Sequence, residues 1–399
     1  MAAPATAKRI ALNGAGLSTF LIVVHATNDA FTGMLSALLP TLQARFLLSE
    51  TVLALLVATL SFSSSVTQPL FGALADRLGR RLVGAIGVML SSALLSLMAV
   101  VPSVYILFGV LLVGGLGSAA FHPAGTSMAR SAGNSNKGLA VSLFSAGGTL
   151  GLAVGPIVIL YVIANFGVGF TPWLMVPGVV LGLLMYLVVP PQNRAPQHNQ
   201  PKLFDLQLFR GPVGTLCISG VLRSISFVTF VNAMPLWLVA THDVTRDAQL
   251  IGWTLAVFSF ASGLGGVTAG ALSKRLSRRT LISGTMLFGM VPLFAIFWLP
   301  PTTAVFFVAV ALAGALLNAG LPIMIVTAQD LVPDRVGTAS GMLMGFTWGT
   351  AGILYIGIGR LQEVIGLTPA MGLSFLTLIP AAVLAEVVLR RYGARLAAM

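Results

Sequence analysis

The apolar stretches of this sequence contain few ionisable residues, and two of these are spaced for joint proton chemistry. His25 and Asp29 are four residues apart, so a helix places them on one face, with Asn28 beside them. Burial pushes a carboxyl group toward its neutral form, so Asp29 can take up and release a proton, with His25 in the same cluster. We therefore assign proton binding to Asp29 and His25, and substrate contacts to His25 and Asn28.

Arg223 lies in a later apolar stretch, 198 positions after His25. An arginine keeps its charge at any accessible pH, and its planar fork suits a carboxylate, phosphate or phosphonate group. Arg223 is thus a candidate for binding an anionic substrate group. The alternative is that Arg223 forms a static ion pair with Asp29 that fixes helix packing, but a buried ion pair rarely adds stability over apolar packing.

Other kinds of chemistry find no support in the sequence. No nucleophile–base spacing or metal-ligand cluster appears, so we expect neither an enzyme nor a metal site. The single cysteine, Cys217, excludes a disulfide framework. Gly-rich runs such as 263–266 lack the Lys-Ser/Thr ending of a nucleotide-binding loop, so we expect no cofactor and no ATP-driven cycle.

The composition indicates that the apolar stretches carrying these ionisable residues lie in a lipid bilayer. Hydrophobic residues make up 57% of the 399 residues and charged residues 8%, with a mean hydropathy of +0.97. A soluble domain carries about 25% charged residues. A helix needs about 20 apolar residues to cross a bilayer, which gives an all-α membrane protein with twelve transmembrane helices. We place the spans near 14–40, 50–73, 82–101, 103–129, 138–163, 170–190, 209–240, 248–272, 280–300, 302–330, 336–359 and 365–389.

The loop charges predict the orientation of these spans. Nearly all Lys and Arg residues of the loops fall on the side of both termini, and only Arg45, Arg246 and Arg360 fall on the other. Positive loops stay in the cytoplasm, so we expect both termini inside and a multi-pass protein of the bacterial inner membrane. The net charge of +12 is then a topology signal and an attraction to anionic lipid, with no role for nucleic acid.

An internal repeat divides the chain into two halves. Gly72-Ala-Leu-Ala-Asp-Arg-Leu-Gly-Arg-Arg81 returns as Gly270-Ala-Leu-Ser-Lys-Arg-Leu-Ser-Arg-Arg279, and the same offset relates His25 to Arg223. Such repeats are typical of transporters. We predict pseudo-symmetric six-helix bundles at 1–190 and 209–399, joined by a polar, proline-containing cytoplasmic linker at 191–208.

The 72–81 turn resembles the signature loop of the major facilitator superfamily, and the resemblance covers the whole chain. His25-Ala-Thr-Asn-Asp29 and Phe121-His-Pro-Ala-Gly125, followed by Arg130, resemble the fosmidomycin-resistance-type branch of efflux proteins. The basic residue that many proton-coupled exporters carry in the middle of span 4 is absent, because Leu111 stands about there.

The resemblance implies where these residues lie. Spans 1 and 7 meet across a central cavity, so Asp29 and Arg223 are expected to face one another. Span 4 lines that cavity, and Pro123 is expected to break its backbone hydrogen bonding beside His122. A conformational latch is expected in the signature turn, with Asp76 bound to neighbouring Arg side chains and to the start of span 11. The substrate contacts are then His25, Asn28, His122, Arg223, Asn232 and Asn318, and the latch residues Gly72, Asp76, Arg77, Gly79, Arg80 and Arg130.

We therefore expect a secondary active transporter, a monomer in the lipid bilayer, whose partners are protons and a small organic molecule. Export driven by proton uptake is the favoured direction, and the compound is anionic or amphipathic. Import of a metabolite or of a lipid-like molecule on the same fold is the first alternative. A membrane receptor or assembly protein without a transport cycle is the second, and it lacks a soluble domain for signalling.

Overall fold

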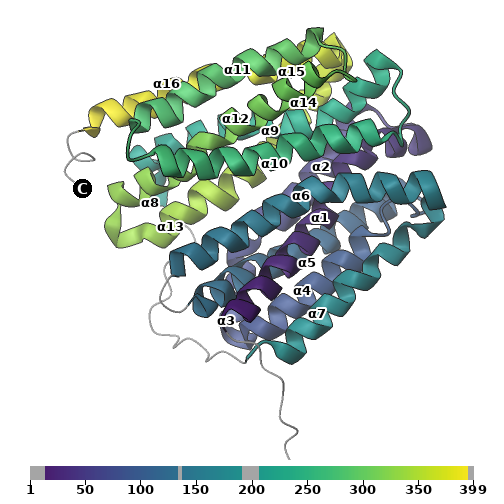
Figure 1. Ribbon diagram of the computed structural model, residues 1–399, viewed down its shortest axis with the longest axis horizontal. Coiled ribbons are helices and arrows are strands. Elements are labelled where there is room, and N and C mark those ends of the chain that lie inside the picture. The colour runs from purple at the N-terminus through teal and green to yellow at the C-terminus, as the bar shows by residue number, and fades with distance from the viewer. Residues whose placement is uncertain (1–13, 134–136, 191–205, 394–399) are drawn as a thin grey trace, which may run out of the picture.

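The computed structural model describes residues 14–133, 137–190 and 206–393, which form helices joined by turns and short loops, with no strand in these ranges. Figure 1 shows two groups of helices, one formed by α1 to α7 and the other by α8 to α16. The predicted all-α membrane fold is therefore confirmed. The domain limits at 190 and 209 stay a prediction, because residues 191–205 lie outside the described part of the chain.

The N-terminal half is built of long apolar helices with polar caps. Ser49 and Ser103 are N-caps, and each hydroxyl accepts a hydrogen bond from a backbone N–H of the first turn. The elements are α1 Gly14–Phe46, α2 Glu50–Ser61, the π-helix η1 Phe62–Val66, α3 Gln68–Leu78, α4 Arg80–Leu95, α5 Val104–Ala132, α6 Lys137–Phe166, η2 Val168–Leu174 and α7 Met175–Val188.

The C-terminal half repeats this plan. Its elements are α8 Leu206–Phe209, α9 Pro212–His242, α10 Gln249–Leu272, η4 Thr280–Gly284, α11 Thr285–Ala295, η5 Ile296–Trp298, α12 Ala304–Leu331, η6 Pro333–Arg335, α13 Val336–Gly341, η7 Met342–Phe346, α14 Thr347–Ile365, α15 Leu367–Phe375 and α16 Leu378–Arg391. The last residues of the predicted linker are thus helical, because α8 begins at Leu206.

Each of the twelve predicted spans contains a helix. Within the described residues, ten helices are long and apolar enough to cross a membrane, and the pair Glu50–Val66 and Gln68–Leu78, bent by 41°, makes an eleventh if it is counted as one span. The remaining span is α4, whose 16 residues fall short of the ~20 that a crossing needs. Turn residues 96–100 extend it.

Two local features concern the proline and glycine residues. Pro123 has no N–H to donate to the hydrogen bonding of its helix, yet α5 runs on to Ala132. Gly72 lies inside α3 rather than in a turn, where its neighbour is the Pro123 ring. Gly79 does occupy the turn and has a φ of 104°, a conformation that favours glycine.

The two halves meet mainly along two pairs of helices, α2 with α14 and α6 with α10, and α1 also packs against α9. Glycines let these backbones approach, since a Cβ on Gly359 would lie 2.7 Å from the Glu50 carbonyl oxygen, and one on Gly252 3.1 Å from Ile157 Cα. We call the end of the molecule with Glu50 and the end of α14 the Glu50 face, and the opposite end, with the signature turn, the Asp76 face.

Hydrogen bonds join the halves toward the Glu50 face. The Thr51 N–H donates to Glu363 Oε1 at 2.9 Å, and deeper in the molecule Ser36 Oγ donates to Asn232 Oδ1 at 2.9 Å. Toward the Asp76 face the two groups diverge, as α3 and α13 show in Figure 1. The structure therefore has the halves joined at the Glu50 face.

Candidate functional site

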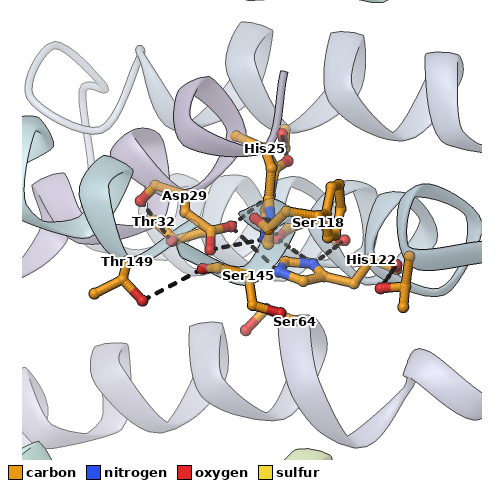
Figure 2. Close-up of polar contacts among 12 residues, drawn as sticks. His25, Asp29, Thr32, Ser64, Ser118, His122, Ser145 and Thr149 are labelled. Atoms are coloured by element: carbon orange, nitrogen blue, oxygen red, sulfur yellow. Dashed lines mark hydrogen bonds and ion pairs between the residues drawn. The ribbon is translucent and has the colours of Figure 1, made fainter. Parts of the chain in front are cut away.

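Three ionisable side chains meet inside the N-terminal half, where α1 and α5 pack together (Figure 2). Asp29 Oδ2 is 3.2 Å from His25 Nε2, and Asp29 Oδ1 is 3.2 Å from His122 Nε2. We call His25, Asp29 and His122 the His–Asp–His trio. His25 and Asp29 are buried, while the His122 side chain is 24% exposed. The structure thus brings together two predicted proton-binding residues and a third residue predicted to contact substrate.

Backbone carbonyls fix both histidine rings. His25 Nδ1 is 2.7 Å from the Phe144 carbonyl oxygen, and His122 Nδ1 is 2.8 Å from that of Ser118. The His25 ring also stacks on Phe144, with 4.1 Å between ring centres. Each ring therefore presents Nε2 to the carboxylate and has little freedom to turn away.

Asn28 holds the carboxylate in place from within the helix bundle. Its Nδ2 donates to Asp29 Oδ1 and to Ser118 Oγ, both at 3.0 Å, and its Oδ1 accepts from Ser91 Oγ at 2.7 Å. Asn28 is fully buried. In this conformation it positions Asp29, and its predicted substrate contact stays a prediction.

A glycine of α6 closes the remaining side of the trio. A Cβ on Gly148 would lie 2.6 Å from Asp29 Oδ2 and 2.6 Å from His25 Nε2, so a side chain at this position would displace the atoms of the trio. The α6 backbone therefore packs directly against the ionisable atoms. Figure 2 shows Ser145 and Thr149 of the same helix beside the trio.

Arg223 lies in a polar cluster of its own in the C-terminal half. Its Nη1 donates to the Leu317 carbonyl oxygen at 3.1 Å and to Asn318 Oδ1 at 3.2 Å, and its Nη2 donates to Ser224 Oγ at 3.0 Å. The side chain is fully buried, and its Nε has no hydrogen-bond partner. In the part of the chain that the structure describes, Arg223 forms no ion pair.

The expectation that Asp29 and Arg223 face one another is therefore wrong for this conformation. The repeat gives His25 and Arg223 equivalent positions in the two halves, but equivalent positions need not touch. Asp29 turns to the histidines of α1 and α5, while Arg223 turns to α12. Each polar group finds its partners within its own half.

A cavity of about 200 Å³ lies between the halves. Of the residues predicted to contact substrate, Asn232 lines it, whereas the trio, Asn28, Arg223 and Asn318 do not. Trp348 lines it and lies against Arg223, whose Cζ is 5.5 Å from the ring centre. The remaining lining mixes hydroxyl and apolar side chains: Thr32, Gly33, Leu35, Ser36, Val57, Leu60, Ser61, Ser64, Ser65, Leu152, Pro156, Phe227, Val228, Val231, Leu255 and Ser259.

The hydroxyl groups of this lining are functional candidates that the sequence reasoning missed. The signal was the run Ser63-Ser64-Ser65 within an apolar span, which the structure folds as the π-helix η1. π-Helical turns are rare overall, but those that occur are often found at functional sites. Thr32 lines the cavity, and its hydroxyl donates to the Asp29 carbonyl oxygen at 2.9 Å, so the cavity wall and the trio adjoin.

The two copies of the repeated turn are held differently. In the first, Arg80 Nη2 donates to Asp76 Oδ1 at 2.9 Å within the turn itself, while Arg77 and Arg130 are exposed. In the second, Arg278 pairs with Asp330 of α12 at 2.7 Å, and Arg279 pairs with Glu386 of α16. The contact of Asp76 with the start of span 11 stays a prediction.

The trio also has the composition of a metal site, although the sequence predicted none. One ligand atom from each of its three residues lies within 4.8 Å of the others. Two histidines and one carboxylate suit several divalent ions. The arrangement can thus hold a positive charge between its nitrogens and oxygens, whether that charge is a proton or a metal ion.

Comparisons with known proteins cover the whole fold. A sequence model of the Major Facilitator Superfamily matches residues 21–356 and again 216–398. The chain is 27% identical over 385 residues to the MFS-type transporter YfnC of Bacillus subtilis (strain 168), with 93% of each chain covered. It is 28% identical over 356 residues to the fosmidomycin resistance protein of Escherichia coli (strain K12), and the aligned region covers 85% of this chain and 84% of that protein. The nucleoside transporter NupG superposes with a TM-score of 0.73 at 18% identity, covering 94% of this chain and 99% of its own.

Proposed function

The chain belongs to the Major Facilitator Superfamily and is a membrane transporter, and from this premise we propose that it exports a small organic compound in exchange for protons. The observation that carries the proposal is a buried carboxylate held between two histidines beside a cavity at the junction of the halves. Ionisable groups inside membrane spans are costly, so they mark ion and substrate pathways.

Alternating access follows from the way the halves meet. Contacts at the Glu50 face join them now, and breaking these contacts while the Asp76 face closes would turn the cavity to the other side of the membrane. The Asp76–Arg80 turn is then free to bind the start of α13, which is the latch role expected from the sequence. We propose that the protein works as a monomer in the bacterial inner membrane with both termini cytoplasmic, so that this conformation opens inward.

The cavity suggests an amphipathic substrate with an anionic group. Phe227, Val228 and Leu255 offer apolar surface, and Ser36, Asn232 and the serines of η1 offer hydrogen bonds. Arg223, behind Trp348, supplies a positive charge that no carboxylate of the described residues neutralises. A relative named for fosmidomycin resistance supports both an exported compound and a phosphonate as the first probe.

Import of a metabolite or a lipid-like molecule remains the second candidate, favoured by the largely apolar lining of the cavity. The lining fits both tasks, so the direction of transport has to be measured.

The test compares everted with right-side-out vesicles from bacteria that express the chain, with radiolabelled fosmidomycin as the probe and an imposed pH gradient. Export by proton exchange predicts accumulation in everted vesicles with an acidic lumen, and its collapse on addition of a protonophore. Accumulation only in right-side-out vesicles would show import instead. Accumulation that ignores the protonophore would reject proton coupling.

A further inference from the structure

The hydrogen bonds of the two trio histidines determine where their protons must be. A carbonyl oxygen only accepts hydrogen bonds, so His25 Nδ1, at 2.7 Å from Phe144 O, carries a hydrogen whatever the charge of the ring. The same holds for His122 Nδ1, at 2.8 Å from Ser118 O. In a neutral ring Nε2 is then a lone-pair acceptor.

Both Nε2 atoms face an acceptor. His25 Nε2 is 3.2 Å from one oxygen of Asp29, and His122 Nε2 is 3.2 Å from the other. An unprotonated Nε2 and a carboxylate oxygen at this distance repel each other, so each nitrogen–oxygen contact becomes favourable only with a positive charge between the two atoms, and a proton can supply it at each contact separately. The trio therefore has two separate places for an exchangeable proton, one on each side of the carboxylate.

No other charged group supplies this positive charge among the residues described around the trio. The groups that surround the trio and Asn28 are uncharged. They are the Ser91 hydroxyl of α4, the Ser118 hydroxyl of α5, and the Gly148 backbone and Phe144 carbonyl of α6. Asn28 donates one N–H to Asp29 Oδ1 and carries no charge. The titratable groups in contact are thus the three members of the trio.

We propose that the trio is a two-proton site. His25 and Asp29 hold one proton between them, and His122 and Asp29 hold the second. His122 is also the place where protons reach the cluster. Fully loaded, it holds two imidazolium rings around one carboxylate, with a formal charge of +1, and fully unloaded it has a charge of −1. His122 is the contact with solvent because its side chain is 24% exposed, against 7% for His25 and 12% for Asp29. This proposal deepens the proposed proton exchange and rests on it for its place in a transport cycle.

The site can be tested without a substrate by nitrogen-15 NMR of the purified full-length protein in lipid nanodiscs. The chain has four histidines, so selective labelling gives few signals, and His25→Gln and His122→Gln assign the two of interest. The nitrogen shifts distinguish the imidazolium ring from each neutral tautomer. We expect both rings to be imidazolium at low pH and both to become the Nδ1–H tautomer at high pH, with the loss of two protons in coupled steps.

Three results would overturn the proposal: an Nε2–H tautomer at either ring, a His122 ring that stays neutral throughout, or spectra that change on treatment with EDTA. The last would identify a metal ion in the trio. Asp29→Asn serves as the matched variant, because it keeps the shape of the side chain but removes the shared acceptor. It should uncouple the two titrations and lower both midpoints, and unchanged midpoints would contradict the role of the carboxylate.

The outcome is independent of the transport assay. A protein that moves no probe in vesicles can still show two coupled titrations, which would reject the proposed function and leave the two-proton site standing. Proton-driven transport with a single titrating histidine would reject the two-proton site alone.

Discussion

Asp29 shares its two oxygens between histidines of different helices, so its charge affects the protonation of both rings. Arg223 presents the opposite case, a buried cation that donates hydrogen bonds to carbonyl, amide and hydroxyl oxygens and lies against the Trp348 ring. The first arrangement suits a charge that comes and goes, and the second suits a charge that stays.

Asp29→Asn should remove the pH dependence of transport. The amide has no negative charge to stabilise the two imidazolium rings, so the histidines of the variant hold their protons less readily, and gradient-driven accumulation should fall to the level of vesicles without the protein. Accumulation measured between pH 5.5 and pH 8 checks this. Asp76→Asn is the matched control and should keep the pH profile even if it slows transport. A parental profile in Asp29→Asn would reject the assigned role.

Arg223→Leu should abolish transport of an anionic probe without destabilising the protein. The guanidinium is fully buried and contacts neutral oxygen atoms among the described residues, so its replacement by an apolar group leaves no opposite charge unpaired. Thermal unfolding and vesicle transport measure the two effects separately. Arg223→Lys, which keeps the charge, should retain part of the transport. A leucine variant that unfolds far below the parent would show that Arg223 is structural.

At the scale of elements, the glycine face of α6 brings its backbone against α1. A Cβ on Gly151 would lie 2.0 Å from the Ala26 carbonyl oxygen, and one on Gly148 would meet the trio itself. The same helix thus packs against backbone at one turn and against ionisable side chains at the next. Substitutions at the two glycines should consequently have different effects.

Gly148→Ala should disturb the trio more than the fold, because the crowded atoms belong to side chains that can shift. We expect loss of proton-driven accumulation with an unfolding temperature close to that of the parent. Gly109→Ala in α5 is the control, since its Cβ would have no neighbour within 4 Å, and alanine in a helix gains roughly 0.5–1 kcal/mol over glycine. Equal transport by the two variants would contradict the tight packing of α6 on the trio.

At the scale of the whole molecule, one backbone hydrogen bond crosses between the halves at the Glu50 face. The Thr51 N–H at the start of α2 donates to Glu363 of α14, so the first turn of α2 is capped by the other half. Separating the halves there leaves this donor without its partner. The cap is therefore present only while this face is closed.

Glu363→Gln should shift the protein toward the conformation open at the Glu50 face, because a neutral amide is a weaker acceptor than a carboxylate. Hydrogen exchange measured by mass spectrometry should show faster exchange in the peptide that contains Thr51. The control is Arg360→Gln, which removes the exposed partner of Glu363 but keeps the acceptor. Equal protection in Glu363→Gln and the parent would exclude a role in closing this face.

The spans and the His25–Asp29 pair could be predicted from the sequence because both depend on local features. The spans follow from runs of apolar residues, and the pair follows from its spacing of four residues in a helix. The sequence did not predict that His122 joins them, since that contact depends on how α5 rotates against α1. It placed Arg223 opposite Asp29 because a repeat shows equivalent positions, whereas contacts depend on the direction of each side chain. The serine lining was missed because a few serines hardly change the mean hydropathy of an apolar span.

The two nitrogen–oxygen contacts of Asp29 also have an electrical consequence. Two protons that cross the membrane through this cluster carry two charges, and the membrane potential acts on each with about 2.3 kcal/mol per 100 mV. Exchange for a neutral or anionic compound would then move net positive charge inward in every cycle. A cell could therefore drive the exporter by voltage alone, even when the pH is equal on the two sides.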